Sequence, residues 1–266
     1  MTFSIAGKTA IVTGGANGIG LAIGRHFIDK GANVIFVDRD EDRLVKEFGE
    51  NDDGNSYRYF AGDLREKLTQ ANLLSATIDA FDSVDILVNA SRQMIAVDPL
   101  NADDDAVETL LQQNMLNALR LSQMVAKRMI KQSKGREEGS NGTIVNLSCI
   151  AARRTNAELL AYSVSTAALD QMTRSLAVAM APNRIRVNGL AFGSVMSHSL
   201  KDSLKDHSEY RGDIEKHTPM HRIASPMELV HSAQYLASDA SAFMTGQVLT
   251  LDGGRTLIDP VTAPAH

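Results

Sequence analysis

The sequence has very little cysteine: Cys149 is the only one among 266 residues. A single thiol cannot form an intrachain disulfide, and such bonds are typical of proteins from oxidising compartments. Residues 1–15 also lack the basic segment, apolar stretch and cleavage site of a secretory signal. No segment approaches the roughly 20 apolar residues that a membrane span requires. These absences predict a protein of the cytoplasm with no membrane partner.

Positive charge is not in excess either. The chain has 27 Lys and Arg against 32 Asp and Glu, which gives a formal net charge of −5. Nucleic acids select basic surfaces, so this balance argues against a nucleic-acid partner. The basic stretch at residues 127–134 is interpreted as a solvated helix end, where cations suit the helix dipole. With 44% hydrophobic residues, the chain can bury one continuous core.

The chain also lacks an internal repeat, a linker and any shift of composition that would divide it. Short apolar runs alternate with helical patterns almost from end to end. This alternation is typical of a parallel sheet covered by helices on both faces. We therefore expect one α/β domain over residues 1–266, with a doubly wound, seven-stranded parallel sheet. The expected strands are 9–12, 34–37, 56–60, 86–88, 143–147, 185–188 and 248–251, and the expected helices are 17–30, 40–48, 102–131 and 157–181.

Residues 194–222 differ from the rest because they are polar and show no strand pattern. They include four of the seven histidines. A long segment of this kind is either a lid over a site or a disordered excursion. His217 and His221 are four residues apart, but Pro219 between them argues against a shared metal, and no metal site is predicted. The proline-interrupted end, residues 257–266, is expected to wrap a neighbouring subunit or the surface.

A glycine-rich turn, TGGANGIGL at residues 13–21, follows the first expected strand. Gly14 permits a tight turn, Gly18 lets the backbone approach a pyrophosphate, and Gly20 allows close packing of helix on strand. The helix that starts here also offers unpaired N–H groups to phosphates. The pattern predicts a dinucleotide-binding Rossmann fold. Its predicted phosphate-binding residues are Gly14, Asn17, Gly18, Ile19 and Gly20.

Asp38 ends the second expected strand, about 20 residues beyond the glycines, where an acid bonds the ribose of a dinucleotide. A carboxylate there accepts from the ribose 2′-hydroxyl of NAD and repels the 2′-phosphate of NADP. The adjacent Arg39 weakens this preference, because a guanidinium can bind that phosphate. The sequence therefore predicts NAD as the cofactor, with NADP less favoured.

The spacing T-G-x-x-x-G-x-G resembles the short-chain dehydrogenase/reductase family, and the resemblance covers nearly the whole chain. Residues 187–193, 237–240 and 245–254 are similar to the family's nicotinamide-side turn and its C-terminal signature. Asp63 and Leu64 are similar to its adenine-side pair. The resemblance implies a homodimer or homotetramer. It also implies cofactor contacts from Asp63, Leu64, Asn89, Thr166, Gly193 and Val195.

The resemblance further implies four catalytic positions, two of which carry other residues here. Tyr162 matches the proton donor, and Asn114 matches the asparagine that holds a relay water. Cys149 stands where the family has a serine, thirteen residues before the tyrosine, and Thr166 stands at its lysine, four residues after. The family's Asn-Asn-Ala-Gly stretch is also altered, to Asn89-Ala90-Ser91-Arg92.

The missing lysine bears directly on Tyr162. A tyrosine is a poor base at neutral pH because its pKa is about 10, and a neighbouring ammonium lowers that value. No lysine lies between Lys134 and Lys201. The cations nearest in sequence, Arg153 and Arg154, are interpreted as exposed, and their reaching the site is a hypothesis. Thr166 could still bond a ribose, and the Cys149 thiol would donate more weakly than a hydroxyl.

Two hypotheses remain open at this point. The first is an NAD-dependent oxidoreductase that acts on a small-molecule alcohol or carbonyl, with a weakened or altered catalytic site. Tyr162 would exchange the proton, Asn114 would hold a relay water and Cys149 would contact the substrate. The second is a catalytically inactive relative, a pseudoenzyme, that serves as an NAD-responsive binding protein or a partner subunit. Thr166, Cys149 and Arg92 favour the second.

Overall fold

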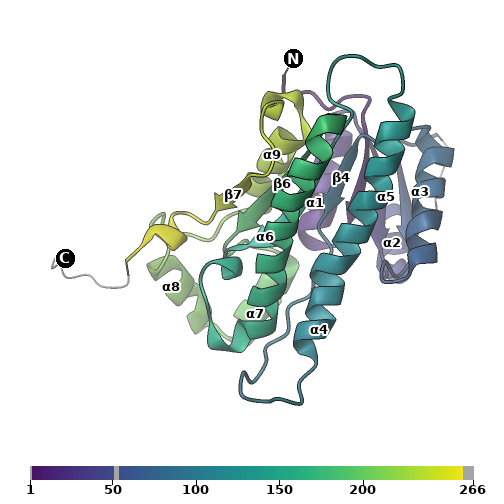
Figure 1. Cartoon of the computed structure of the whole chain (residues 1–266). Coiled ribbons are helices and arrows are strands. Elements are labelled where there is room, and N and C mark those ends of the chain that lie inside the picture. The colour runs from purple at the N-terminus through teal and green to yellow at the C-terminus, as the bar shows by residue number, and fades with distance from the viewer. Residues whose placement is uncertain (1, 51–53, 260–266) are drawn as a thin grey trace.

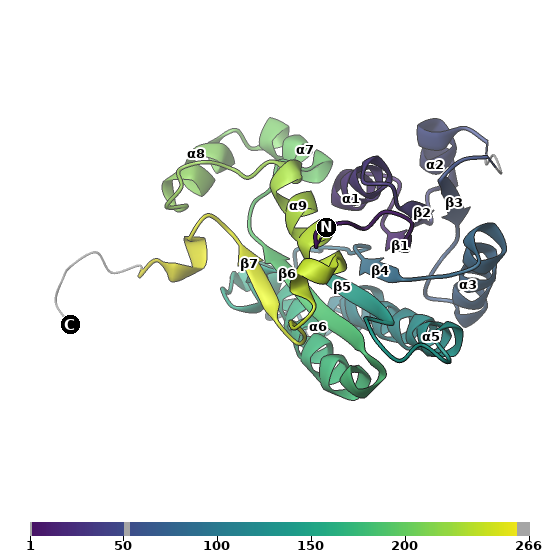
Figure 2. The same cartoon turned by 90° about the horizontal axis from the view of Figure 1, so that it is seen from above.

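Parallel strands form the centre of the structure (Figure 1), in a seven-stranded sheet ordered β3-β2-β1-β4-β5-β6-β7 (Figure 2). The computed structural model describes residues 2–50 and 54–259, so residues 260–266 of the expected C-terminal wrap lie outside the described residues. Most strands are apolar runs buried on both faces, as parallel sheets require. The order confirms the predicted doubly wound α/β fold. The strands are β1 Thr9–Thr13, β2 Asn33–Asp38, β3 Tyr57–Ala61, β4 Ile86–Asn89, β5 Gly142–Cys149, β6 Ile185–Phe192 and β7 Val248–Leu251.

Helices cover both faces of this sheet (Figure 2). One face packs against α1 (Gly18–Asp29), α2 (Glu41–Phe48) and α9 (Pro226–Ala237) around one apolar core. The other face packs against α3 (Lys67–Phe81), α5 (Asn117–Gln132) and α6 (Leu160–Met180) around a second. Two cores on one sheet leave its carboxyl-terminal edge open for a ligand.

The helix expected over 102–131 is interrupted. It begins only with α4 (Ala106–Leu111), passes through a π-helical turn, η1 (Gln112–Leu116), and continues as α5. Turns of this type widen the hydrogen-bond ladder and occur often at functional sites. Here the π-helical turn contains Asn114. Helices α3 and α9 were not predicted.

Residues 194–222 are not a disordered excursion within the described part of the chain. They contain α7 (His198–Asp206) and α8 (Glu209–Lys216), which lie toward the carboxyl-terminal edge of the sheet (Figure 1). Val195 and Ala224 form a parallel bridge that closes the base of this excursion. The segment is therefore an ordered helical pair, as a lid requires.

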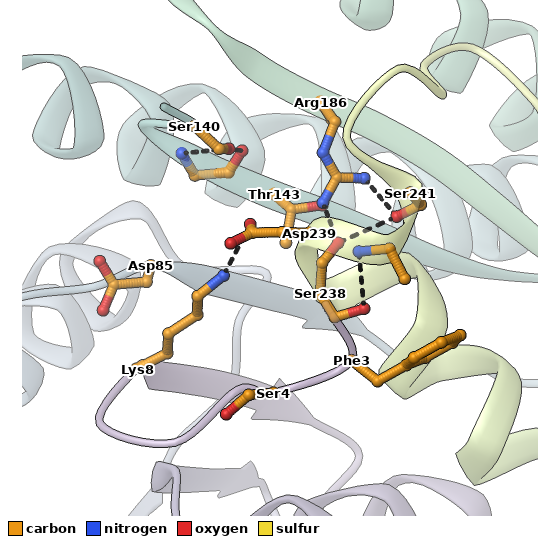
Figure 3. Close-up of polar contacts among 12 residues, drawn as sticks. Phe3, Ser4, Lys8, Asp85, Ser140, Thr143, Arg186, Ser238, Asp239 and Ser241 are labelled. Atoms are coloured by element: carbon orange, nitrogen blue, oxygen red, sulfur yellow. Dashed lines mark hydrogen bonds and ion pairs between the residues drawn. The ribbon is translucent and has the colours of Figure 1, made fainter. Parts of the chain in front are cut away.

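The opposite, amino-terminal edge of the sheet is closed by a polar cluster (Figure 3). Lys8 Nζ lies 3.2 Å from Asp239 Oδ1. The buried Arg186 guanidinium donates to Ser241 Oγ at 2.7 Å and to the Ser238 carbonyl at 3.0 Å. These bonds tie the start of the chain to the segment after α9 and to β6.

No helix in the described residues combines the length and the apolar character that crossing a membrane would take.

Candidate functional site

A cavity of about 410 Å³ opens at the carboxyl ends of the strands. It lies where β1 neighbours both β2 and β4, the point at which the strand order reverses. In open α/β sheets this is where ligands bind. The lining residues are Gly14, Asn17, Gly18, Ile19, Gly20, Val37, Asp38, Arg39, Asp40, Arg43, Gly62, Asp63, Leu64, Ala90, Ser91, Arg92, Gln93, Gln113, Leu147, Phe192 and Ser197.

The glycine turn shapes one wall of this cavity. Gly14 has φ 67°, a backbone conformation that side chains rarely adopt. A Cβ at Gly20 would lie 2.2 Å from the Gly14 carbonyl oxygen, so only glycine allows the helix this close to the turn. Asn17 precedes α1 without a side-chain cap, and the first turn carries no acid. The helix N–H groups therefore remain available to an anion in the cavity.

Asp38 is held in a fixed position at the end of β2. Its Oδ2 accepts from the Ala16 N–H at 3.2 Å, and its Oδ1 accepts from the Asp40 N–H, also at 3.2 Å. The carboxylate lines the cavity beside Arg39 and Arg43, and Arg43 is paired with Asp40 at 3.1 Å. A ribose hydroxyl bonded by Asp38 would thus meet both a carboxylate and nearby guanidinium groups.

The predicted adenine-side pair also lies in the cavity wall. Asp63 and Leu64 follow β3, and Asp63 accepts from Arg65 Nε at 2.8 and 3.0 Å. This bond holds the pKa of the Asp63 carboxyl below its ordinary value, against a smaller opposing effect of burial. The group is therefore ionised at neutral pH.

The loop after β4 is fixed from behind by a buried polar network. Thr13 Oγ1 accepts from the N–H groups of Ala90 and Ser91, each at 3.0 Å. Asn89 donates to Asn146 Oδ1 at 2.8 Å, so its side chain faces the sheet interior and does not line the cavity. Asn89 thus supports the loop from within.

The predicted proton donor, Tyr162, lies just behind the far end of the cavity. Its side chain is 1% exposed and does not belong to the cavity lining. Arg92, from the loop after β4, donates through Nη1 to the Tyr162 hydroxyl at 2.5 Å. The Arg92 guanidinium also lies over the Phe192 ring, 4.5 Å from its centroid. Arg92 lines the cavity and contacts the phenol, so it connects Tyr162 to the cavity wall.

Burial dominates the acidity of Tyr162. It raises the pKa of the phenol well above the ordinary value, and the neighbouring Cys149 raises it further. Arg92 acts in the opposite direction and lowers it. Cys149 is half-buried at the end of β5 and packs in the same small apolar cluster as Tyr162.

Asn114 lies in η1 and is fully bonded. Its Oδ1 accepts from the Gln93 N–H at 2.8 Å, and its Nδ2 donates to the Gln93 carbonyl at 2.9 Å and to Ser165 Oγ at 3.0 Å. The side chain therefore fixes the residue after Arg92 and links it to α6. A water held at this position would have to bond the backbone of η1.

Thr166 turns away from the cavity. It is 3% exposed, and its Oγ1 donates to the Tyr162 carbonyl of its own helix at 2.9 Å. Arg153 donates to Thr250 Oγ1 at 3.0 Å, and Arg154 bonds the Thr256 carbonyl, so neither reaches Tyr162. The cation beside the phenol is Arg92, whose place in the altered Asn89–Arg92 stretch was the sequence signal that could have identified it.

The two remaining predicted cofactor residues follow β6. Val195 is buried in the core, and a Cβ at Gly193 would meet Asp252 at 3.2 Å. Neither lines the cavity, whereas the preceding Phe192 does. Within the described ranges no three His, Cys, Asp or Glu side chains gather as metal ligands would.

Comparisons with known proteins agree with this geometry. A family model described as enoyl-(acyl carrier protein) reductase matches residues 14–256. The chain is 30% identical over 255 residues to an uncharacterised oxidoreductase of Mycobacterium tuberculosis, a match that covers 96% of this chain and 94% of the relative.

Two solved structures have the same fold at similar identity. The gluconate 5-dehydrogenase of Burkholderia cenocepacia, in complex with NADP and tartrate, superposes with a TM-score of 0.86 at 27% identity, over 97% of this chain and 98% of that one. A 7α-hydroxysteroid dehydrogenase complexed with NADH and 7-oxo glycochenodeoxycholic acid gives a TM-score of 0.83 at 29% identity, over 95% and 96%.

Proposed function

The chain belongs to the short-chain dehydrogenase/reductase family of oxidoreductases, and from that premise we propose that it is an NAD-dependent oxidoreductase of a small-molecule alcohol or carbonyl. The observation that carries the proposal is the glycine-walled cavity, with the fixed Asp38 carboxylate at one end and Arg92 over Tyr162 at the other. These residues suit a dinucleotide because the start of α1 offers N–H groups to phosphates and the Asp38 carboxylate can bond a ribose hydroxyl.

The residues divide the chemistry between them. Bound NADH would supply the hydride that reduces a carbonyl carbon. Tyr162 then gives its Oη proton to the carbonyl oxygen, so that its O–H bond breaks as the substrate O–H bond forms. Cys149 contacts the substrate beside the phenol, and Asn114 fixes the loop that carries Arg92. Oxidation of an alcohol reverses these steps.

We propose NAD over NADP because of Asp38. Its carboxylate would repel a 2′-phosphate, and both of its oxygens are already oriented by backbone N–H groups. Arg39 and Arg43 oppose this effect, but Arg43 is paired with Asp40 and is partly neutralised. Isothermal titration with NAD⁺, NADH and NADPH separates the cofactors directly. Tighter binding of NADPH would contradict the assignment.

A second candidate, a catalytically inactive dinucleotide-binding relative, is favoured by two observations. Tyr162 is almost fully buried, and Thr166, at the family's lysine position, bonds its own helix and does not line the cavity. The two candidates differ in a carbonyl-reduction screen with NADH, in which Tyr162→Phe serves as the control. Turnover that falls about 10²–10³-fold in Tyr162→Phe supports the enzyme. Tight cofactor binding without turnover supports the inactive relative, and no dinucleotide binding refutes both.

The proposed assembly is a homodimer or homotetramer in the cytoplasm. Several exposed apolar side chains support association, because apolar patches on a protein surface often mark an interface. Light scattering coupled to size exclusion measures the state, and a monomer at micromolar concentration would contradict it. The exposed apolar residues are Leu160, Val164 and Val178 on α6, together with Phe243 and Leu257 near β7.

A further inference from the structure

The contact between Arg92 and Tyr162 joins parts of the chain that are 70 residues apart. Arg92 reaches the phenol from the loop after β4, and its Nη1 lies 2.5 Å from the hydroxyl oxygen. A charge-assisted hydrogen bond of this kind is about twice as strong as a neutral one. The bond therefore places a permanent positive charge beside the Tyr162 hydroxyl oxygen, the atom that must lose and gain a proton.

The surroundings of Tyr162 make that charge necessary. The phenol is buried beside Ala106, Leu110 and Ala161, and an apolar environment opposes ionisation. Among the described residues, two titratable or charged groups act on it: Arg92 from the β4 loop and Cys149 from the end of β5. Of the two, only Arg92 carries a positive charge, so it is the group that favours the phenolate.

Arg92 is also held in place before any reaction. Its guanidinium stacks on the Phe192 ring, where a cation is attracted to the aromatic face. The backbone on one side is fixed by the Ser91 N–H bond to Thr13, and on the other by the bonds between Gln93 and Asn114. A charge that is already oriented needs no rearrangement when the transition state forms.

We propose that Arg92 is a catalytic residue of this protein, the cation that stabilises the Tyr162 phenolate during proton transfer. The inference rests on the oxidoreductase function proposed above. In reduction, Tyr162 Oη loses its proton to the carbonyl oxygen that has accepted the hydride at its carbon, and Arg92 Nη1 continues to donate to the resulting phenolate. Solvent returns the proton to Oη afterwards. The cation that acts on Tyr162 thus comes from the loop after β4 and not from α6, the helix that carries the tyrosine.

A titration of position 162 in the cofactor-free full chain tests the proposal without a substrate. A fluorotyrosine incorporated at position 162 has a lower intrinsic pKa and reports its own ionisation by fluorine NMR, apart from the four other tyrosines. Arg92→Met should lower its acid ionisation constant at least tenfold, which is one pKa unit. Arg92→Lys, which keeps the charge, should lower it less than threefold.

Arg153→Met is the matched control, because Arg153 is an exposed cation bonded to Thr250 and is remote from the phenol. It should leave the ionisation constant within twofold of the parent value. A change of less than twofold in Arg92→Met, or an equal change in Arg153→Met, overturns the proposal. Since the Arg92 side chain lies at the cavity surface, thermal unfolding should show all three variants folded.

Dinucleotide binding and carbonyl reduction test the oxidoreductase function separately from the titration. If Arg92→Met shifts the titration but no dinucleotide binds and no carbonyl is reduced, Arg92 stabilises the Tyr162 phenolate but the proposed function is refuted. If turnover is found and its pH profile moves in Arg92→Met in the same direction as the titration, both the proposed function and the role of Arg92 are supported. If turnover is found with an unchanged profile, the role of Arg92 in proton transfer is refuted while the function remains.

Discussion

Gly20→Ala is expected to destabilise the protein although it places alanine in a helix. In an unobstructed helix, replacing glycine by alanine stabilises by about 0.5–1 kcal/mol, because glycine loses more backbone entropy on folding. At Gly20 the new Cβ would lie 2.2 Å from the Gly14 carbonyl oxygen and 2.8 Å from the Gly14 carbonyl carbon. Both are backbone atoms of the turn, so no side-chain rotation can relieve the overlap.

Relief therefore requires the turn to move by about 1 Å away from α1, and overpacking of this kind costs about 1–3 kcal/mol. The entropy gain offsets part of this, which leaves a net loss of up to roughly 2.5 kcal/mol. Because the turn forms the cavity wall, we also expect dinucleotide affinity to fall about tenfold, equivalent to 1.4 kcal/mol. Urea denaturation measures the first quantity and isothermal titration measures the second.

Gly212→Ala is the control for the backbone effect. Gly212 lies within α8, and a Cβ added there would meet no atom within 4 Å. This variant should gain about 0.5–1 kcal/mol of stability. If Gly20→Ala gained stability to the same extent, the turn would be free to move, and the argument that glycine is required there would be refuted.

Three further outcomes follow from the site. Thr166→Lys should change the acid ionisation constant of a fluorotyrosine at position 162 less than threefold in the parent protein. In Arg92→Met, where the phenol lacks a cation, the same substitution should raise that constant at least tenfold. Equal effects in the two proteins would contradict the role given to Arg92. Asp38→Ser should shift the NADPH-to-NADH affinity ratio at least tenfold toward NADPH, measured by calorimetry, and an unchanged ratio would remove Asp38 from cofactor choice. Burial raises the pKa of the Asp170 carboxyl above its ordinary value, so the folded state binds this proton more tightly than the unfolded state and loses stability as pH rises through the folded pKa. Asp170→Asn should therefore be more stable than the parent at pH 7 and not at pH 3, by urea denaturation, and a gain that persisted at pH 3 would point to another cause.

The nucleotide half of the site was predictable because its signals are local. Gly14, Gly18 and Gly20 lie within one turn, and Asp38 follows the next strand directly. The backbone conformation and the close approach that these positions need are set by neighbours a few residues away. The structure places all four in the cavity wall.

The chemical half was not predictable in the same way. Helix spacing points to a cation one turn on from Tyr162, and sequence proximity points to the loop just before it. The cation instead comes from Arg92, through a contact that depends on how β4 and α6 meet in three dimensions. Sequence spacing along one helix carries no information about a residue in a loop that follows a distant strand.

Helix α3 was missed for a different physical reason. Its buried side chains are Gln70, Leu73 and Thr77, so two of three are polar. Gln70 Nε2 donates to the Leu64 carbonyl at 2.7 Å and Thr77 Oγ1 donates to the Leu73 carbonyl at 2.8 Å, so each buried side chain has a donor that is satisfied inside the protein, although Gln70 Oε1 has no partner. A search for an apolar stripe cannot detect a face whose burial is supported by hydrogen bonds.

The polar cluster at the amino-terminal edge of the sheet has a consequence for synthesis of the chain. Lys8 meets Asp239, and Gln234 donates to the Phe3 carbonyl at 2.9 Å, each pair separated by 231 residues. While the ribosome is still translating, the first strand has been made but its closing contacts have not. Because residues 234–239 are made late, the segment before β1 and the side of α1 that packs in one core with α9 stay partly unprotected until α9 leaves the exit tunnel. A chain stalled before residue 239 should therefore engage chaperones for longer than one released at full length.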